Sequence, residues 1–214
     1  MSTSLEDLKL SKKARYFIKH TLKGVKNGTT KLITLEGTTQ ASKTTDVGFV
    51  SVPLMMQSEQ KYHFIAGVDV SAIEKNYIND DKVGILAMYD NVKYYGRGDK
   101  DDKKPHLKIY MPDGSYKVSR IFAFGKSDDW RNFRTGTYGV TILDEADQAD
   151  PHALTEAMLR GTDVRILTLN PNAPDLPVYN KINHCRPLPK YIDEYPEQLL
   201  NELLMKAKKN NNKI

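Results

Sequence analysis

The sequence predicts an α/β fold in which a mostly parallel central sheet is flanked by helices and carries an antiparallel hairpin insert. A short β-type run over residues 32–35 leads into a glycine-containing loop and then a helical segment. A second apolar run, over residues 138–143, ends in two adjacent carboxylates. Between them, two alternating segments surround a Pro-Asp-Gly-Ser turn. Helical crossovers combined with one antiparallel insert indicate a mixed sheet.

Length and composition narrow the class of protein. The 214 residues suffice for one large domain, or for one and a half small ones, with a sizeable core. The formal net charge of +5 permits a nucleic-acid partner without requiring one. The single Cys185 excludes an intramolecular disulfide and fits a reducing, cytosolic compartment. No zinc site is expected, because the histidines lack metal-ligand spacing. No run of about 18 apolar residues and no signal-peptide core is present, so no membrane partner is expected.

The segment Lys31–Thr45 matches the phosphate-binding pattern G-x-x-x-x-G-K-[ST], with Ser42 in place of the second glycine. Such a loop points backbone N–H groups inward, and the following helix N-terminus adds partial positive charge. Lys43 is expected to reach the β- and γ-phosphates of ATP, and the Thr44 hydroxyl to ligate Mg²⁺. The alternative is a surface turn. The residues predicted to bind nucleotide are Gly37, Thr38, Thr39, Gln40, Ala41, Ser42, Lys43, Thr44 and Thr45.

Several elements are predicted on either side of this loop. Apolar spacing indicates a helix over residues 5–23 before it and another over residues 44–56 after it, which Pro53 is expected to kink or shorten. Residues 62–68 form an apolar run suited to a buried parallel strand. A short helix over residues 71–77 is expected, with Ser71 as N-cap and Glu74 in the capping-box position.

The middle of the chain differs from the rest in its pattern of charged and apolar residues. Residues 99–105 mix charges of both signs and are interpreted as a solvated loop. Residues 107–111 and 116–124 alternate around the turn and predict a hairpin whose second strand enters the central sheet. The surrounding lysines suit either a track for DNA phosphates or a solvated face, and the neighbouring aspartates favour the solvated face. These lysines are Lys93, Lys100, Lys103, Lys104 and Lys108.

The apolar run that ends in Asp144 and Glu145 is typical of a Walker B strand. Asp144 is expected to hold Mg²⁺, and Glu145 to act as the base that orients or deprotonates the attacking water. The alternative is a strand that ends in a polar loop. A helix from Asp150 or Pro151 through Leu159 follows.

The next strand, over residues 164–169, places Thr168 and Asn170 where a γ-phosphate sensor is expected. An ordinary polar strand end with an Asn-Pro turn is the alternative.

The segments GTTQASKT, FGKSDDWRNFRTGTYGVTILDEAD and ILTLNPNAPDLPVYNKINHCRPLP together resemble the ATPase domain of the phage terminase large subunit. The resemblance covers about Lys31 to Pro189. It implies a P-loop ATPase of the additional-strand, conserved-glutamate type that uses ATP and Mg²⁺ to drive double-stranded DNA into a viral capsid. Its implied partners are the capsid portal and the small terminase subunit, in the cytoplasm of an infected bacterial host. A homo-oligomeric ring is implied for the assembled motor, and a monomer for the isolated chain.

The resemblance also implies a division of the chain. Residues 1–30 form an N-terminal helix and lead-in, residues 31–190 the ATPase core, and residues 191–214 a C-terminal helix and polar tail towards a nuclease domain. The acidic metal ligands of such a nuclease are not found in the sequence, so the chain is interpreted as the isolated motor domain.

The predicted phosphate loop contains no arginine, so a catalytic arginine must come from elsewhere. Arg134 is the candidate for a finger that acts on a neighbouring subunit, and Arg131 is the next choice. The alternative is that both are surface residues or contacts to DNA phosphates. Arg97 and Arg120 are weaker candidates.

Three other functions are compatible with these motifs. A regulatory GTPase is one, because residues 180–183 resemble the start of a guanine-specificity motif, although Asn183 replaces its aspartate. A recombination or repair ATPase with the same core is a closer rival. A non-enzymatic assembly module, which binds ATP without hydrolysing it alone, is the third.

Overall fold

The computed structural model describes residues 10–38, 42–172, 175–183 and 185. Three residues of the predicted phosphate loop, Thr39, Gln40 and Ala41, lie outside the described residues. The predicted C-terminal helix and tail, within residues 191–214, also lie outside them.

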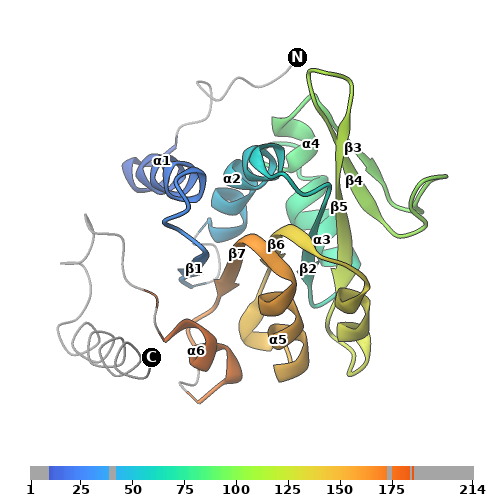
Figure 1. The fold of residues 1–214 in the computed structure, drawn as a ribbon. Coiled ribbons are helices and arrows are strands. Elements are labelled where there is room, and N and C mark those ends of the chain that lie inside the picture. Colours follow the sequence, from blue (N-terminus) through green and yellow to red (C-terminus); the bar gives the residue numbers. More distant parts are fainter. Residues whose placement is uncertain (1–9, 39–41, 173–174, 184, 186–214) are drawn as a thin grey trace.

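The described residues form one seven-stranded sheet with the order β1-β7-β6-β2-β5-β4-β3 (Figure 1). The first five strands in this order are parallel, and β4 and β3 continue the sheet in antiparallel fashion from β5. This arrangement confirms the predicted mixed sheet, and the predicted hairpin is β4 with β5. The strands are β1 (Leu32–Glu36), β2 (Tyr62–Gly67), β3 (Val92–Tyr95), β4 (His106–Tyr110), β5 (Tyr116–Ala123), β6 (Tyr138–Leu143) and β7 (Gly161–Leu169).

Helices cover both faces of the parallel part of the sheet (Figure 1). One face carries α1 (Lys12–Lys26), α2 (Lys43–Gln57), α3 (Val70–Ile73), the π-helix η1 (Glu74–Ile78) and α4 (Ile85–Met88). The other carries the 3₁₀ helices η2 (Asp129–Thr135) and η3 (Ala146–Gln148) with α5 (Pro151–Arg160) and α6 (Pro177–Ile182). Among the described residues, no helix is both long enough and apolar enough to cross a membrane.

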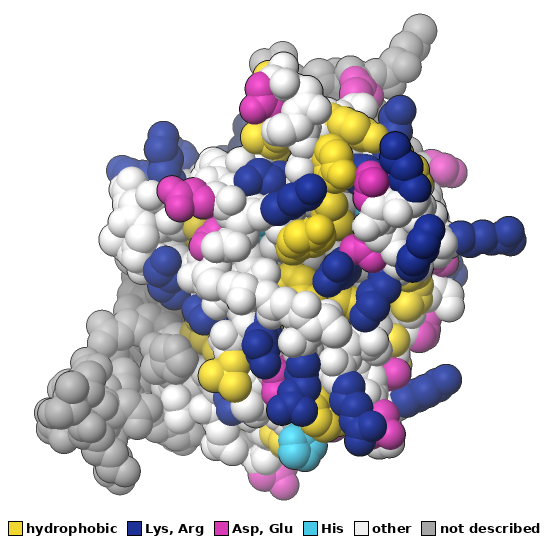
Figure 2. All heavy atoms as spheres, turned by 45° about the vertical axis from the view of Figure 1, so that its right-hand side comes forward, with side chains coloured by type: hydrophobic (Ala, Val, Ile, Leu, Met, Phe, Trp, Pro, Cys, Tyr) yellow, Lys and Arg dark blue, Asp and Glu magenta, His cyan; other side chains and the backbone are white. Residues whose placement is uncertain are grey.

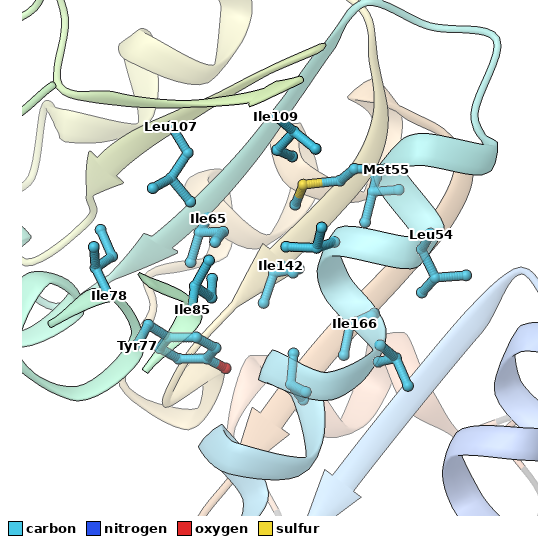
Figure 3. Close-up of a cluster of buried hydrophobic side chains, with 14 of the residues drawn as sticks. Leu54, Met55, Ile65, Tyr77, Ile78, Ile85, Leu107, Ile109, Ile142 and Ile166 are labelled. Carbon is cyan, nitrogen blue, oxygen red and sulfur yellow. The ribbon is translucent and has the colours of Figure 1, made fainter. Parts of the chain in front are cut away.

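Two hydrophobic cores follow from the alternation of side chains along each strand. On β2, Ile65 belongs to the core beneath α2, and its neighbour Phe64 belongs to the core beneath α5. Figure 3 shows the first core, in which Ile142 and Ile166 from neighbouring strands lie near side chains of α2. Because successive strand residues point to opposite faces, continuous apolar runs are required where both faces are covered.

Two predicted helix starts are corrected by the structure. The first helix begins at Lys12, where the Ser11 hydroxyl accepts a hydrogen bond from the Ala14 backbone N–H at 3.0 Å. The short helix is capped by Asp69 rather than Ser71, since the Asp69 carboxylate accepts from the Ala72 N–H at 2.7 Å. Asp69 is the last extended residue after β2, so Ser71 is already inside the helix.

Pro53 does not shorten α2, which continues to Gln57, one residue beyond its predicted end. A proline inside a helix leaves the carbonyl four residues earlier without its usual donor. Here the Tyr89 hydroxyl donates to that carbonyl, Phe49 O, at 2.9 Å. The sequence analysis missed both α4 and β3, the elements on either side of Tyr89.

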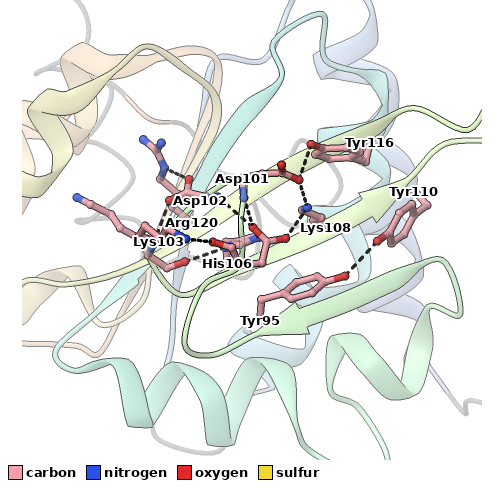
Figure 4. A network of polar contacts seen from close by, with 11 residues as sticks. Tyr95, Asp101, Asp102, Lys103, His106, Lys108, Tyr110, Tyr116 and Arg120 are labelled. Atoms are coloured by element: carbon pink, nitrogen blue, oxygen red, sulfur yellow. Dashed lines mark hydrogen bonds and ion pairs between the residues drawn. The ribbon is translucent and has the colours of Figure 1, made fainter.

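The loop over residues 99–105 is a loop, as predicted, but it is not merely solvated. The Asp102 side chain is buried and forms an ion pair with Arg120 at 2.6 Å between Nε and Oδ2. The Lys108 side chain is 6 % exposed and pairs with both Asp99 and Asp101 (Figure 4). The ion pairs of its acidic residues therefore attach the loop to β4 and β5.

His63 on β2 is expected to make the free energy of unfolding depend on pH. The ring is fully buried, and its Nδ1 accepts a hydrogen bond from the Val140 N–H at 3.1 Å. Burial lowers the pKa of His63 to about 3, and the charge of Lys117 acts in the same direction, against Asp163. In the unfolded chain the pKa returns to about 6.5, so the unfolded state binds the proton first as pH falls.

The contribution of the neutral His63 ring to the free energy of unfolding is therefore complete above about pH 6.5, and it is lost as the pH falls towards 3. Chemical denaturation at several pH values across this range measures the slope of the free energy of unfolding against pH. In His63→Gln, whose amide oxygen retains the acceptor, the slope is expected to shrink. The exposed His20→Gln serves as the control and is expected to keep the slope of the parent chain. Equal slopes in both variants would contradict this assignment.

Candidate nucleotide site

Three chain segments meet at the carboxyl edge of β1, β7 and β6. The register pairs Leu35 of β1 with Thr168 of β7, and Leu143 of β6 with Leu167 of β7. Because the three strands are parallel, the loops that follow them leave the sheet at the same edge. The strand β7 lies between the strand that precedes the predicted phosphate loop and the strand that ends at the two carboxylates.

Lys43 is the first residue of α2, and its ammonium group points back into its own loop. The Nζ donates to Gly37 O at 2.6 Å, to Thr38 O at 2.9 Å and to the Asn170 Oδ1 at 3.1 Å. Phosphate oxygens are acceptors of the same kind. The lysine therefore brings a predicted phosphate-loop residue and a predicted sensor residue together.

Ser42 replaces the second glycine of the motif and takes the backbone conformation that favours glycine. Its φ is 58° and its ψ is 14°, in the left-handed region. A residue with a Cβ costs about 1–2 kcal/mol there. The loop therefore keeps the geometry expected for glycine at some cost in stability, and the following residues, Thr44 and Thr45, lie in the first turn of α2.

Thr168 connects the Asp144 carboxylate with the Glu145 backbone at the end of β6. Its hydroxyl donates to the Asp144 Oδ1 at 2.5 Å and accepts from the Glu145 backbone N–H at 3.0 Å. Glu145 has a φ of 53° and a ψ of 46°, so its backbone is also left-handed. Such strain in a non-glycine residue persists only where surrounding contacts enforce it, and it gathers at functional sites. The Gln148 amide donates to the Glu145 Oε2 at 2.8 Å.

The environment of Asp144 favours a cation. Burial, and then the charge of Glu145, raise the pKa of Asp144, whereas hydrogen bonds from Thr168 and Thr44 and the charge of Lys43 lower it. A bound cation would stabilise the carboxylate against this desolvation. The donors are a hydroxyl and a carboxylate oxygen, which suit Mg²⁺ held by one or two protein ligands together with phosphates. Thr44 and Asp144 therefore fit the predicted metal.

Three neighbouring residues were missed by the sequence analysis. The buried Asp147 accepts a hydrogen bond from the Asn170 N–H at 3.0 Å and so fixes the predicted sensor loop. Gln148 orients Glu145. Both follow Asp144 and Glu145 in the sequence, where a polar loop was already expected, so no separate pattern marked them.

Tyr77, the third missed residue, comes from the π-helix η1. Its side chain is 1 % exposed, and no group among the described residues hydrogen-bonds its hydroxyl. Burial, and then the charge of Asp144, raise the pKa of Tyr77 well above its usual value. A π-helical turn with a buried polar group near a charged site is a common feature of functional sites. The sequence pattern had indicated only a short helix there.

The structure does not bring the candidate arginines to this edge. Arg134 lies on η2, before β6 begins, and its Nε is 3.3 Å from the Glu156 Oε1 on α5. The Arg134 side chain is 56 % exposed. Arg131 pairs with Asp128, and Arg120 with Asp102. A catalytic role for Arg134 therefore needs the site of a second copy, and it stays a prediction.

Comparison with solved structures shows what this fold resembles. The large terminase from the thermophilic bacteriophage D6E in complex with ADP matches with a TM-score of 0.61 and 20% sequence identity, over 92% of this chain and 44% of that chain. The ATPase domain of the Thermus phage P74-26 large terminase matches with a TM-score of 0.52 and 15% identity, over 84% of this chain and 76% of that one. The HK97 bacteriophage large terminase matches with a TM-score of 0.56 and 12% identity, over 87% of this chain and 37% of that one.

The chain therefore has the P-loop NTPase fold of large terminase ATPase domains, as the motifs indicated. It spans less than half the length of the D6E and HK97 terminase chains that it matches. No family model matches the sequence, and no curated protein matches it either.

Replacing Thr168 tests its bridge between the Asp144 carboxylate and the Glu145 backbone. Thr168→Val keeps the shape but leaves Asp144 without its donor and the Glu145 N–H without its acceptor. We expect the free energy of unfolding to fall by roughly 2–4 kcal/mol, since one bond involves a charged group. Thr168→Ser is expected to restore most of this stability. The control Thr137→Val, at an exposed position just before β6, is expected to change it by no more than about 0.5 kcal/mol. An unchanged midpoint in urea for Thr168→Val would rule the bridge out.

Proposed function

We propose that this chain is the ATPase motor domain of a DNA-packaging machine, which hydrolyses ATP with Mg²⁺ and drives double-stranded DNA into a viral capsid. One observation carries the proposal. Lys43, Asp144 and Glu145 converge with Thr168 and Asn170 at one edge of the sheet. The fold of large terminase ATPase domains supports it, since two of the similar D6E structures are complexes with ADP and ATP-gamma-S.

Binding rests on the phosphate loop and the first turn of α2. Lys43 exchanges its carbonyl partners for the β- and γ-phosphate oxygens, and the backbone N–H groups of the loop and helix N-terminus face the same charge. Thr44 and Asp144 hold Mg²⁺. When bound, the metal supplies neutralisation of the charge that develops on the phosphates.

Glu145 is the proposed base. It orients the attacking water and accepts its proton, and the bond from Gln148 fixes one carboxylate oxygen so that the other remains for this task.

Thr168 and Asn170 are the proposed sensors. In this structure the Lys43 ammonium holds the Asn170 side chain, and Asp147 holds the Asn170 backbone. A γ-phosphate competes with Asn170 for Lys43. Binding and loss of that phosphate therefore switch a contact between the phosphate loop and the segment after β7, which can pass the change to the rest of the motor.

Catalysis is proposed to need a second copy of the chain. Arg134, exposed and paired with Glu156, would reach the γ-phosphate of a neighbour in a homo-oligomeric ring. The capsid portal and the small terminase subunit are the proposed partners, in the cytoplasm of an infected bacterial host. Residues 31–190 are the proposed ATPase core, with residues 1–30 as lead-in and residues 191–214 as the link to a nuclease domain.

The position of Arg134 also favours one alternative, a module that binds ATP but turns it over little on its own. The GTPase hypothesis gains no comparable support, because Asn180 and Lys181 lie inside helix α6.

Calorimetry of Mg·ATP with the purified chain tests the binding site. The Lys43→Ala variant removes the only side chain that bonds both the phosphate loop and Asn170 among the contacts described, so we expect its heat of binding to vanish. Lys82→Ala, a change of the same charge on an exposed lysine, is expected to bind as the parent does. Equal affinity in all three proteins would refute the phosphate loop, and displacement of ATP by GTP would favour a GTPase.

Glu145→Gln separates binding from hydrolysis. We expect it to bind ATP like the parent and to lower turnover at least about 100-fold, since general-base catalysis contributes about 10²–10⁴. Phosphate release should be measured with portal-bearing capsids and DNA, so that a neighbouring copy can complete the site. Glu59→Gln, on an exposed glutamate, is the matched control. Full turnover in Glu145→Gln would exclude Glu145 as the base, and silence of the parent under all conditions would favour the binding module.

A further inference from the structure

The excess positive charge is concentrated in two regions of the chain. The helix α1 carries six Lys or Arg residues and no Asp or Glu. Residues 91–126, which contain β3, β4 and β5, carry nine Lys or Arg residues against four Asp residues, and this excess equals the +5 of the whole chain. In Figure 1 this antiparallel extension lies on the far side of the sheet from α1 and β1. This second basic region therefore lies at the opposite end of the sheet from α1, β1 and the phosphate loop that follows β1.

The sequence indicated that Asp99, Asp101 and Asp102 cancel the surrounding lysines, but in the structure they pair with Lys108 and Arg120 rather than with the exposed lysines. Asp99 and Asp101 both bind Lys108, at 2.5 Å and 2.6 Å, and Asp102 binds Arg120 (Figure 4). These ion pairs lower the pKa of each of the three carboxyl groups or hold it down against burial. Three carboxylates therefore form ion pairs with two cations, the buried Lys108 and the half-buried Arg120. The exposed lysines around them keep their charge.

The side chains of the extension alternate between the core and the open face. On β4, Leu107 and Ile109 belong to the hydrophobic core, and Lys108 and Tyr110 point the other way. The register places Lys93 opposite Lys108, and Tyr110 opposite Tyr116. Lysines and tyrosines from three strands therefore share one face, which we call the Lys–Tyr face. It comprises Lys61, Lys93, Tyr95, Lys108, Tyr110 and Tyr116.

The lysines of this face lie over the tyrosine rings. The Nζ of Lys61 is 4.7 Å from the Tyr116 ring centroid, and that of Lys93 is 5.6 Å from the Tyr110 ring centroid. Lys108 lies beneath, 4.6 Å from the Tyr116 centroid and 5.3 Å from the Tyr95 centroid. Figure 2 shows this side of the molecule, with Lys and Arg side chains spread around a strip of side chains of the hydrophobic class, which includes Tyr.

The position of the lysines over the tyrosine rings favours a phosphate backbone over the stacked bases of a single strand. A single-stranded nucleic acid binds through bases that stack on open aromatic rings. Here lysine head groups lie over the rings, and the tyrosine hydroxyls bond to one another or to Asp101, so the face offers cations rather than open stacking surfaces. Such groups contact phosphate oxygens and carry no sequence information.

We propose that the Lys–Tyr face binds the phosphate backbone of double-stranded DNA, without reading its sequence. The choice of a duplex rests on the proposed function, whereas the choice of phosphate rests on the charge and ring geometry of this face. Lys61 and Lys93 make the contacts, and the buried Lys108 with its two aspartates holds the tyrosines in place.

Fluorescence anisotropy of a labelled short duplex with the full chain, without nucleotide, tests the proposal. The binding constant scales with salt as about the −0.9 power for each phosphate contact, so losing two contacts at 0.1 M salt lowers the affinity by about 60-fold. We expect this loss in the double variant Lys61→Gln/Lys93→Gln, together with a reduction of about 1.8 in the magnitude of the salt slope. The control is Lys75→Gln/Lys82→Gln, with the same change of charge on exposed lysines of η1 and the loop that follows it, and it should bind as the parent does.

Lys61→Arg/Lys93→Arg, which keeps the charge, should bind within a fewfold of the parent and guards against a folding defect in the glutamine pair. Equal losses in the control pair and the test pair would overturn the proposal, because net charge alone would then account for binding. Tighter binding of the single strand, or equal competition by poly-glutamate, would overturn it as well. Because no ATP is present, these outcomes are independent of whether Lys43 binds nucleotide.

Discussion

The arrangement of the candidate site depends on the register of β7 between β1 and β6. Thr168 lies opposite Leu35, and Leu167 lies opposite Leu143, so the Thr168 hydroxyl reaches the residues that follow β6. A slip of one residue would turn every side chain of β7 to the other face and break both bonds of Thr168. The buried Ile166 and Leu167 prevent that slip, because each fills a different core. Ordinary packing on both faces of the sheet therefore fixes the polar geometry at its edge.

That edge also concentrates the unfavourable features of the structure. Ser42 and Glu145 are the non-glycine residues with positive φ in the described chain. Asp144 has a raised pKa, and Tyr77 has a buried hydroxyl with no hydrogen-bond partner among the described residues. Strained backbone costs about 1–3 kcal/mol for each residue, and an unpaired buried hydroxyl about as much. The two cores offset these costs, and a nucleotide with its metal would relieve the electrostatic part.

The antiparallel extension follows a different physical rule. Among the described residues, none of β3 or β4 belongs to the second core, and the cations Lys108 and Arg120 on the open face are held by carboxylates and rings instead. Removing one partner of such a buried pair is expected to be costly, since it leaves the other charge desolvated. The strand β2 joins this region to the nucleotide edge, because it pairs with β5 on one side and with β6 on the other. A rigid sheet thus connects the proposed DNA surface with the proposed site of hydrolysis.

The sequence by itself determined most of the strands and the order of the motifs, although α4 and β3 carried no recognised signal. Apolar runs predicted the strands β2, β6 and β7, the Pro-Asp-Gly-Ser turn predicted the hairpin, and motif spacing predicted the convergence of Lys43 with Asp144. These are local signals, since each is written in consecutive residues. Only the tertiary structure decided which donor satisfies Phe49 O across Pro53, that Asp147 and Tyr77 adjoin the site, and that Arg134 pairs with Glu156. It also decided which charges cancel, because Asp99 and Lys108 meet through folding of the loop and not through their order in the chain. Such contacts depend on burial and distance between segments, for which the one-dimensional pattern carries no signal.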